Sequence, residues 1–210
     1  MRKLVNFAKT LMPIAFWVMI MFGFETVSIT FMTLLAAIIH EFGHIAVISV
    51  FCKDSPLLPI PKIDGMRITP SRILSYKEEI FSAFGGPCAN LILFLLLLPF
   101  FKNPNGYAVT FASINLMTAL SNLLPICGFD GYKILLNSVS LKFGCERAEI
   151  ILCALSFITS SIFLFLSLYL ILKIGEGYWL FGIFFTSTLA EVFKYNNSTK
   201  LKNTRDFERY

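Results

Sequence analysis

The sequence predicts an all-α polytopic membrane protein with about six transmembrane helices and a short membrane-associated β-hairpin between the second and third. Of the 210 residues, 56% are hydrophobic and only 15% are charged, which is too little charge to cover the surface of a soluble domain of this size. The apolar residues also come in blocks long enough to cross a ~30 Å hydrocarbon core, which takes roughly 20 helical residues. One polytopic domain in a bilayer is therefore the predicted class.

Six apolar segments are expected to form the membrane spans. They cover residues 11–24, 31–51, 80–101, 107–124, 150–172 and 178–193. Only Glu25-Thr26-Val27-Ser28 separates the first two, so a tight helical connection is expected there. No small-residue cleavage site follows the basic N-terminus, so the first segment is expected to be a retained helix and not a signal peptide. We therefore expect one transmembrane domain over residues 1–195 and a polar cytoplasmic tail over residues 196–210.

The basic residues predict how these spans are oriented. With six spans, the two termini and the segments 53–79 and 126–148 lie on one side, which then carries every Lys and Arg except Lys102 and Lys173. Since basic residues accumulate on the cytoplasmic side, both termini are expected to be cytoplasmic in a multi-pass protein of the cell membrane. The basic residues are not interleaved with aromatic ones, and no phosphate-binding glycine loop occurs, which argues against a nucleic-acid partner.

The chain has only two histidines, and they stand four residues apart in His40-Glu41-Phe42-Gly43-His44. On a helix this spacing puts both imidazoles on one face, one turn apart, where they can share a Zn²⁺. Glu41 projects beside them and can take a proton from metal-bound water. Two histidines satisfied by neighbours are the alternative, but polar groups of this kind are costly inside an apolar span and normally mark function. The segment therefore predicts a zinc site with Glu41 as the catalytic base.

A catalytic zinc site with two histidines needs a third protein ligand if the fourth position is kept for water. Asp130 is the candidate, in a segment that closes the fourth span on the face toward which the second span also runs. Pro125 and Gly128 break the helix there and free the backbone to bend Asp130 back toward the histidines. Cys127 is a rival ligand, and an ordinary turn or helix-capping role for Asp130 is the other alternative.

A third unusual segment, Gly85-Gly86-Pro87-Cys88-Ala89-Asn90, lies inside the third apolar stretch. Adjacent glycines allow close contact between helices, Pro87 frees a carbonyl, and Asn90 follows about one turn later. Two interpretations are open: a notch for helix packing, and direct contact of Asn90 with the substrate or the oxyanion in the active site.

Three motifs, in this order and on separate spans, carry a resemblance to a known family. H-E-F-G-H (40–44), G-G-P-C-A-N (85–90) and N-L-L-P-I-C-G-F-D-G (122–131) resemble the three signatures of the site-2 proteases, which are intramembrane zinc metalloproteases. The chain is most similar to the small bacterial and archaeal branch that includes the sporulation pro-sigma-factor protease. The resemblance covers the region from about residue 31 to residue 135.

The resemblance implies that the zinc ligands are His40, His44 and Asp130. It also implies that Glu41 is the catalytic base and that Asn122 helps to orient the substrate or the oxyanion. It also implies regulated intramembrane proteolysis of a membrane-protein substrate, for example a transcription-factor, anti-sigma or pro-sigma precursor, and it is compatible with a homo-oligomer. Tyr132 departs from the pattern, because many relatives have a second glycine after Asp-Gly. This departure leaves the metal ligands unchanged.

The segment between the second and third spans has a signature of its own. Asp64-Gly65 is flanked by alternating apolar residues between Lys62 and Ile68, a pattern typical of a β-hairpin. A hairpin edge on the active-site side could pair with an extended substrate. A plain surface connector is the alternative.

These features together predict an intramembrane zinc metalloendopeptidase that hydrolyses peptide bonds of membrane-embedded or membrane-associated proteins. In this mechanism zinc activates a water molecule, Glu41 accepts its proton and later passes it to the leaving amine. A substrate helix must first unwind locally, because its carbonyls are otherwise hydrogen-bonded and shielded. The alternative is a membrane zinc carrier or a catalytically silent relative that binds zinc without proteolysis. Glu41 and the clustering of all candidate ligands toward one face favour the protease.

Overall fold

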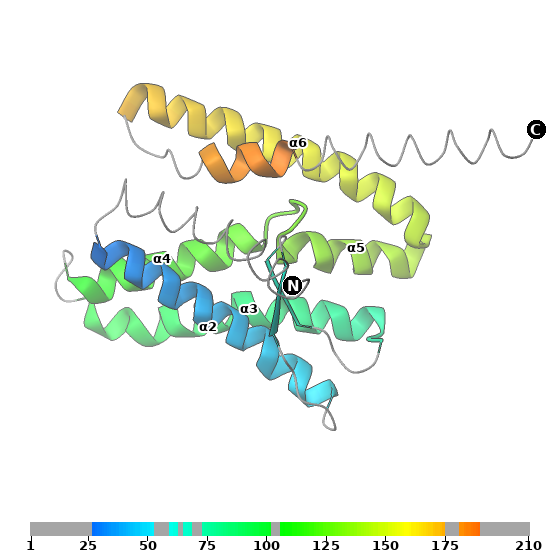
Figure 1. The fold of residues 1–210 in the computed structure, drawn as a ribbon, viewed down its shortest axis with the longest axis horizontal. Helices are drawn as coiled ribbons and strands as arrows, with labels where there is room; N and C mark the ends of the chain where they lie inside the picture. Colours follow the sequence, from blue (N-terminus) through cyan, green and yellow to red (C-terminus); the bar gives the residue numbers. More distant parts are fainter. Residues whose placement is uncertain are drawn as a thin grey trace, which may run out of the picture.

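The computed structural model describes residues 27–52, 59–62, 65–68, 73–101, 106–174 and 181–189. Along the chain, its elements are α2 (Val27–Phe51), β1 (Pro59–Lys62), β2 (Gly65–Ile68), α3 (Tyr76–Leu97), the 3-10 helix η1 (Leu98–Phe100), α4 (Tyr107–Asn122), α5 (Asp130–Phe143), α6 (Cys145–Ile174) and a helical segment over 181–189 (Figure 1). The expected first span, 11–24, and the expected polar tail, 196–210, lie outside the described residues.

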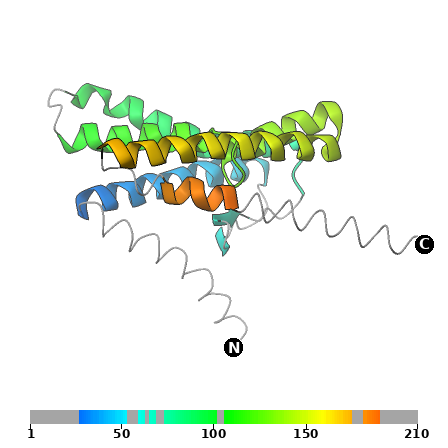
Figure 2. The ribbon, with the colours of Figure 1, turned by 90° about the horizontal axis from the view of Figure 1, so that it is seen from above.

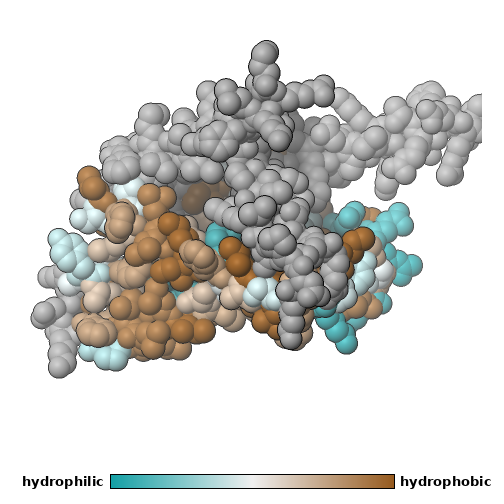
Figure 3. All heavy atoms as spheres, turned by 60° about the horizontal axis from the view of Figure 1, so that its bottom comes forward, coloured by the Kyte–Doolittle hydropathy of each residue, from teal (hydrophilic) through white to brown (hydrophobic). Residues whose placement is uncertain are grey.

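Three of the described helical stretches, Val27–Phe51, Tyr76–Phe100 and Cys145–Lys173, are long and apolar enough to cross a membrane. Each is roughly 37–44 Å long at 1.5 Å per residue, against a hydrocarbon core of ~30 Å. Their outward faces carry large apolar side chains such as Phe31 and Leu96, which are 66% and 64% exposed. Figure 3 shows apolar side chains covering much of one face, with hydrophilic residues gathered toward one end. Such a surface is unsuited to water, and it indicates a membrane protein.

The fourth expected span continues into a second helix after a break. α4 ends at Asn122, and α5 begins at Asp130 after the turn 123–129. The two helices follow one another along the long axis of the molecule, and α6 runs back alongside them (Figures 1 and 2). α5 lies within the segment 126–148, which was expected to be a connection, so this helix was not predicted. Its polar residues, Lys133 among them, keep its mean hydropathy well below that of a span.

Two helices begin earlier than hydropathy alone predicts. α3 begins at Tyr76 because Ser75 and Glu78 form a capping box. The Ser75 backbone N–H donates to Oε2 of Glu78 over 2.9 Å, and the Glu78 backbone N–H donates to Oγ of Ser75 over 3.4 Å. α2 likewise begins at Val27, inside the stretch that was expected to separate the first two spans. The polar capping residues Ser75 and Glu78 therefore extend α3 beyond its apolar segment.

β1 and β2 form a two-stranded antiparallel sheet in the segment where the Asp-Gly signature predicts a hairpin. Pro59 lies opposite Ile68, and Lys62 lies opposite Gly65. The two strands occur between α2 and α3 in the chain. The turn residues 63–64 lie outside the described residues.

α3 is the central helix of the site, because it contacts α2, α4 and α5. It approaches α2 closely at Gly43 and Gly85. A Cβ built on Gly43 would collide with the carbonyl oxygen of Gly85, so only glycine permits this backbone separation. The interpretation of the double glycine as a packing notch is therefore confirmed for Gly85. Because the two helices cross closely here, the face of α2 that carries both histidines packs against α3.

Candidate metal centre

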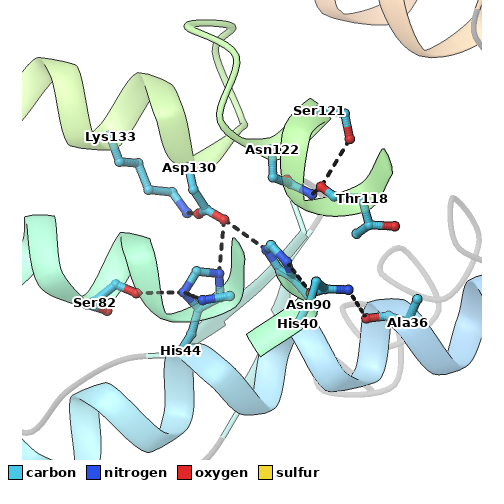
Figure 4. Close-up of polar contacts among 11 residues, drawn as sticks. Ala36, His40, His44, Ser82, Asn90, Thr118, Ser121, Asn122, Asp130 and Lys133 are labelled. Atoms are coloured by element: carbon cyan, nitrogen blue, oxygen red, sulfur yellow. Dashed lines mark hydrogen bonds and ion pairs between the residues drawn. The ribbon is translucent and has the colours of Figure 1, made fainter. Parts of the chain in front are cut away.

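His40 and His44 lie on the inner face of α2, and their side chains extend toward Asp130 at the start of α5 (Figure 4). The i, i+4 spacing on a continuous helix places the imidazoles one turn apart, with ring centroids separated by 4.8 Å. Both residues are buried, with exposed fractions of 6% and 8%. The helix therefore delivers two imidazoles to one enclosed point, as their spacing predicts.

α3 makes room for the two rings at Gly86. A Cβ on this residue would lie 2.5 Å from Nε2 of His40 and 2.5 Å from Nε2 of His44. The two glycines of the G-G-P motif thus have different tasks. Gly85 allows α2 and α3 to approach, whereas Gly86 leaves open the space into which both ring nitrogens point.

The turn 123–129 carries Asp130 to this space. Gly128 has φ +97°, a left-handed conformation that favours glycine. The backbone N–H of Cys127 donates to Oγ of Ser156 on α6 over 2.7 Å, which ties the turn to that helix. A Cβ on Gly131 would collide with the backbone of Leu123 and Leu124, so the first turn of α5 packs directly on the start of the turn. The expected bending of the chain at Pro125 and Gly128 is what brings Asp130, now 3% exposed, into the interior.

Three donor atoms meet at the centre of the site. Oδ2 of Asp130 lies 2.9 Å from Nε2 of His40 and 3.1 Å from Nε2 of His44. The other carboxylate oxygen, Oδ1, accepts a hydrogen bond from Nζ of Lys133 at 2.8 Å, one turn further along α5. One oxygen of Asp130 therefore faces the imidazoles while the other is held from outside.

The second nitrogen of each imidazole is also engaged. Nδ1 of His40 lies 3.0 Å from Oδ1 of Asn90, and Nδ1 of His44 lies 2.7 Å from the backbone oxygen of Ser82. Because these oxygens can only accept, both Nδ1 atoms must carry the proton and donate. The backbone N–H of Gly86 also lies 3.3 Å from Nδ1 of His44. The shorter contact to a carbonyl decides the tautomer, since a protonated nitrogen cannot accept from Gly86.

This tautomer leaves the neutral rings with unprotonated Nε2 atoms, aimed at the same carboxylate oxygen. Three lone pairs at these distances repel one another unless a proton or a metal ion lies between them. Hydrogen-bonding the outer nitrogen of a metal-ligating histidine is also how proteins fix its orientation and raise its basicity. The arrangement of His40, His44 and Asp130 is therefore built for a positive charge.

The donor set fits zinc. The ligand atoms of the three residues all lie within 4.8 Å of one another. Ligands of a tetrahedral Zn²⁺, at ~2.0–2.1 Å from the ion, are separated by ~3.3 Å from each other, close to the distances found here. Two imidazole nitrogens and one carboxylate oxygen are a known catalytic zinc set, which keeps the fourth position open. Cys127, the rival third ligand, is not a member of this group.

Glu41 follows His40 on α2 and is half-buried at the edge of the site. Among the described residues it has no hydrogen-bond or ion-pair partner, unlike Asp130, whose two oxygens are both engaged. Its carboxylate is therefore available to exchange a proton with a molecule that enters the site.

The two asparagines named by sequence lie in different positions. Asn90 is fully buried (0% exposed) and bonds to the His40 ring, so its carbonyl oxygen is occupied by a metal-centre residue. Both of its amide hydrogens are also used, by Ala36 and Asn115. Asn122 is half-buried at the end of α4, beside the Asp130–His40 contact in Figure 4, and donates to the Thr118 carbonyl over 2.9 Å. Asn90 thus supports the histidine, whereas Asn122 lies at the edge of the site.

Several residues of the site were not predicted. Ser82 contributes a backbone carbonyl, which no side-chain pattern encodes. Lys133 and Ser156 act on Asp130 and on its turn from positions outside the motifs used for prediction. Asn115 is different, because a primary amide inside an apolar stretch is itself a signal of function or of a buried partner.

Comparison with solved structures found a protein of the same fold. The site-2 protease from Methanocaldococcus jannaschii matches with a TM-score of 0.58 and 20% sequence identity, over 86% of this chain and 88% of that one. Comparisons with protein-family models and with curated protein sequences found no match. At this identity the likeness concerns the fold, so the chain has the site-2 protease fold, in agreement with the resemblance of its motifs.

Proposed function

We propose that this protein is an intramembrane zinc metalloendopeptidase of the site-2 protease type. The observation that carries the proposal is the convergence of His40, His44 and Asp130 beside Glu41, a carboxylate with no hydrogen-bond or ion-pair partner among the described residues. The shared fold with a site-2 protease supports it independently of the motifs. A zinc ion held by the three ligands would supply Lewis-acid activation of a water molecule and of the scissile carbonyl.

The residues of the chain divide the remaining work. Glu41 accepts a proton from the attacking water and then delivers it to the nitrogen of the leaving amine. Asn90 and the Ser82 carbonyl hold the two imidazoles in the required tautomer, and Lys133 holds the outer oxygen of Asp130. Preorganisation of this kind keeps the ligands in place while the substrate changes.

Asn122 is proposed to contact the substrate or the oxyanion. It lies at the edge of the site, and only one of its two amide hydrogens is engaged with a described residue, the Thr118 carbonyl. The second hydrogen is then free to donate to a substrate carbonyl. For Asn90 we propose a supporting role in place of the expected substrate contact, because its hydrogen-bonding groups are all used inside the protein.

The proposed substrate is a segment of a membrane-embedded or membrane-associated protein, such as a transcription-factor, anti-sigma or pro-sigma precursor. We further propose six spans with both termini in the cytoplasm and a homo-oligomer as a compatible assembly. His40 stands in the middle of α2, a candidate span. A substrate that reaches it must expose a peptide bond at membrane depth, which favours segments with helix-breaking residues.

A membrane zinc carrier, or a catalytically silent relative, is the second candidate function. A carrier needs ligands that release the metal and a path of polar sites to both faces. In the described part of the chain, the three residues above form the one group of His, Cys, Asp and Glu side chains that could hold a metal. Glu41 is also surplus to a carrier, because three ligands are already present. Both features favour the protease.

The test compares the wild-type protein with Glu41→Gln in proteoliposomes that contain single-pass fusion substrates, each with a Gly-Pro break at a different depth. Glutamine keeps the size of the side chain but cannot accept a proton, so zinc should stay bound while cleavage falls by at least ~10²-fold. Glu79→Gln, an exposed position on α3, is the matched control and should cleave normally. Wild-type cleavage by Glu41→Gln would refute the proposed base. Zinc transport across the vesicle by a protein that cleaves none of the substrates would favour the carrier.

A further inference from the structure

Asn115, on α4, is bonded to the metal centre through a chain of side chains that crosses three helices. Its Oδ1 accepts a hydrogen bond from Nδ2 of Asn90 over 2.9 Å, and Oδ1 of Asn90 contacts Nδ1 of His40 at 3.0 Å. Both asparagines have an exposed fraction of 0%. We propose that Asn115 is a positioning residue of the zinc site: through Asn90 it fixes the tautomer and the orientation of His40.

We call Asn115, Asn90 and His40 the relay. Two backbone carbonyls determine the donor and the acceptor of each hydrogen bond in it. Nδ2 of Asn115 donates to the Phe111 carbonyl over 2.8 Å, so the oxygen of Asn115 must face Asn90. Nδ2 of Asn90 donates to the Ala36 carbonyl over 3.1 Å, so the oxygen of Asn90 must face His40. Since a carbonyl can only accept, neither amide can flip without placing two acceptors together. The ring of His40 must then donate from Nδ1 and keep Nε2 free for the metal.

Asn115 has a second link to the same centre. It stands on α4, the helix that leads directly into the turn 123–129 and Asp130. Its bond to Asn90 fixes α4 against α3, and the bond from Asn90 to the Ala36 carbonyl fixes α3 against α2. Asn115 therefore helps to fix the position of α2, which carries both histidine ligands, relative to the segment that carries Asp130.

The energetics suggest function in addition to packing. A buried amide with an unmade hydrogen bond costs about 1–3 kcal/mol, whereas an apolar pair of the same shape can be nearly neutral. Two asparagines in the interior of an apolar bundle are therefore poorly explained by stability. They are well explained by a need to hold the imidazole of His40 in one tautomer and one orientation, which a hydrocarbon side chain cannot do.

The inference rests on the proposed zinc site, and zinc affinity in purified protein tests it without any substrate. Removal of an outer hydrogen-bond partner typically lowers metal affinity 10–100-fold. We expect Asn90→Leu to fall in this range and Asn115→Leu to lower zinc affinity by about tenfold, measured by chelator competition. Thr118→Val is the matched control on the same helix. It removes a hydroxyl that, in the described part of the chain, bonds only to the Ile114 carbonyl, and zinc affinity should stay within about twofold of wild type.

A double variant separates positioning from general destabilisation. If Asn115 acts through Asn90, the variant with both leucines should bind zinc no more weakly than Asn90→Leu alone. Independent structural losses would multiply instead, and that result would overturn the relay. Unchanged zinc affinity in Asn115→Leu would overturn it too. Failure of the wild-type protein to bind zinc is a different outcome, because it contradicts the proposed function itself.

A measurement on the unmutated network covers the case in which Asn115→Leu does not fold. In zinc-loaded protein labelled with ¹⁵N-histidine, the spectrum contains two imidazoles, because the chain has two histidines. A His44→Cys variant, which retains a zinc-binding side chain, identifies the ring of His40. We expect this ring to be bound through Nε2 and to carry a slowly exchanging proton on Nδ1. Zinc bound through Nδ1, or a rapidly exchanging Nδ1 proton, would show that no such relay exists.

Discussion

Replacement of Gly86 with alanine is expected to empty the metal centre and leave the helices intact. The added methyl would lie 2.5 Å from Nε2 of both His40 and His44, whereas ordinary contacts begin at 3.4 Å. The rings and the methyl must therefore separate by about 0.9 Å, at the two atoms that meet the metal. A misplacement of this size costs on the order of 10²-fold in activity, and we expect a comparable loss in zinc affinity.

The same substitution should not weaken the fold, because alanine favours a helix interior over glycine by about 1 kcal/mol. Gly85→Ala is the matched comparison, one residue earlier. Its methyl meets the backbone of α2 at Gly43 and not the imidazoles, so it should lower the melting temperature. For both variants, zinc affinity is measured by chelator competition and the melting temperature by thermal unfolding. Wild-type zinc affinity in Gly86→Ala would refute the placement of the metal between the two rings.

Three further predictions concern the third ligand, its partner and the orientation. Asp130→Ala should lower zinc content well below one ion per chain by elemental analysis, and full occupancy would show that another group is the third ligand. Lys133→Met should weaken zinc binding by less than tenfold, because its side chain is 56% exposed and its ion pair is screened. The control is Lys142→Met, at an exposed position at the end of α5. Equal zinc affinities in the two variants would show that Lys133 has no role at the site. Reporter fusions at Asn105 and Tyr210 should lie in opposite compartments, and one shared compartment would contradict six spans with cytoplasmic termini.

The part of the site on α2 could be predicted because its information is local. In H-E-F-G-H, the chemistry of the residues and their relative position are both set by one turn of helix. Asp130 required more, since sequence placed it on the correct side and at a break in the chain but gave no measure of its distance from His40. That distance depends on Gly128, on Gly131 and on the tie to α6, which are tertiary features.

The remaining differences have equally physical causes. α5 was missed because hydropathy identifies spans and not helices of mixed polarity, and the early start of α3 was missed because a capping box lies outside the apolar run. Asn90 was recognised as significant, but its contact with His40 was not predicted. From the sequence, an amide near an active site could face the substrate or a ligand, and only the positions of Ala36 and Asn115 decide between them.

The measurement that tests the central claim most directly is proteolytic activity as a function of zinc content. Wild-type protein is stripped of metal with a chelator, reloaded with increasing amounts of Zn²⁺, and assayed on the fusion substrate that it cleaves best. We expect no cleavage by the stripped protein and a linear recovery that saturates at one zinc per chain. Asp130→Ala should fail to recover at the same zinc concentration. Undiminished cleavage by metal-free protein would contradict the central claim.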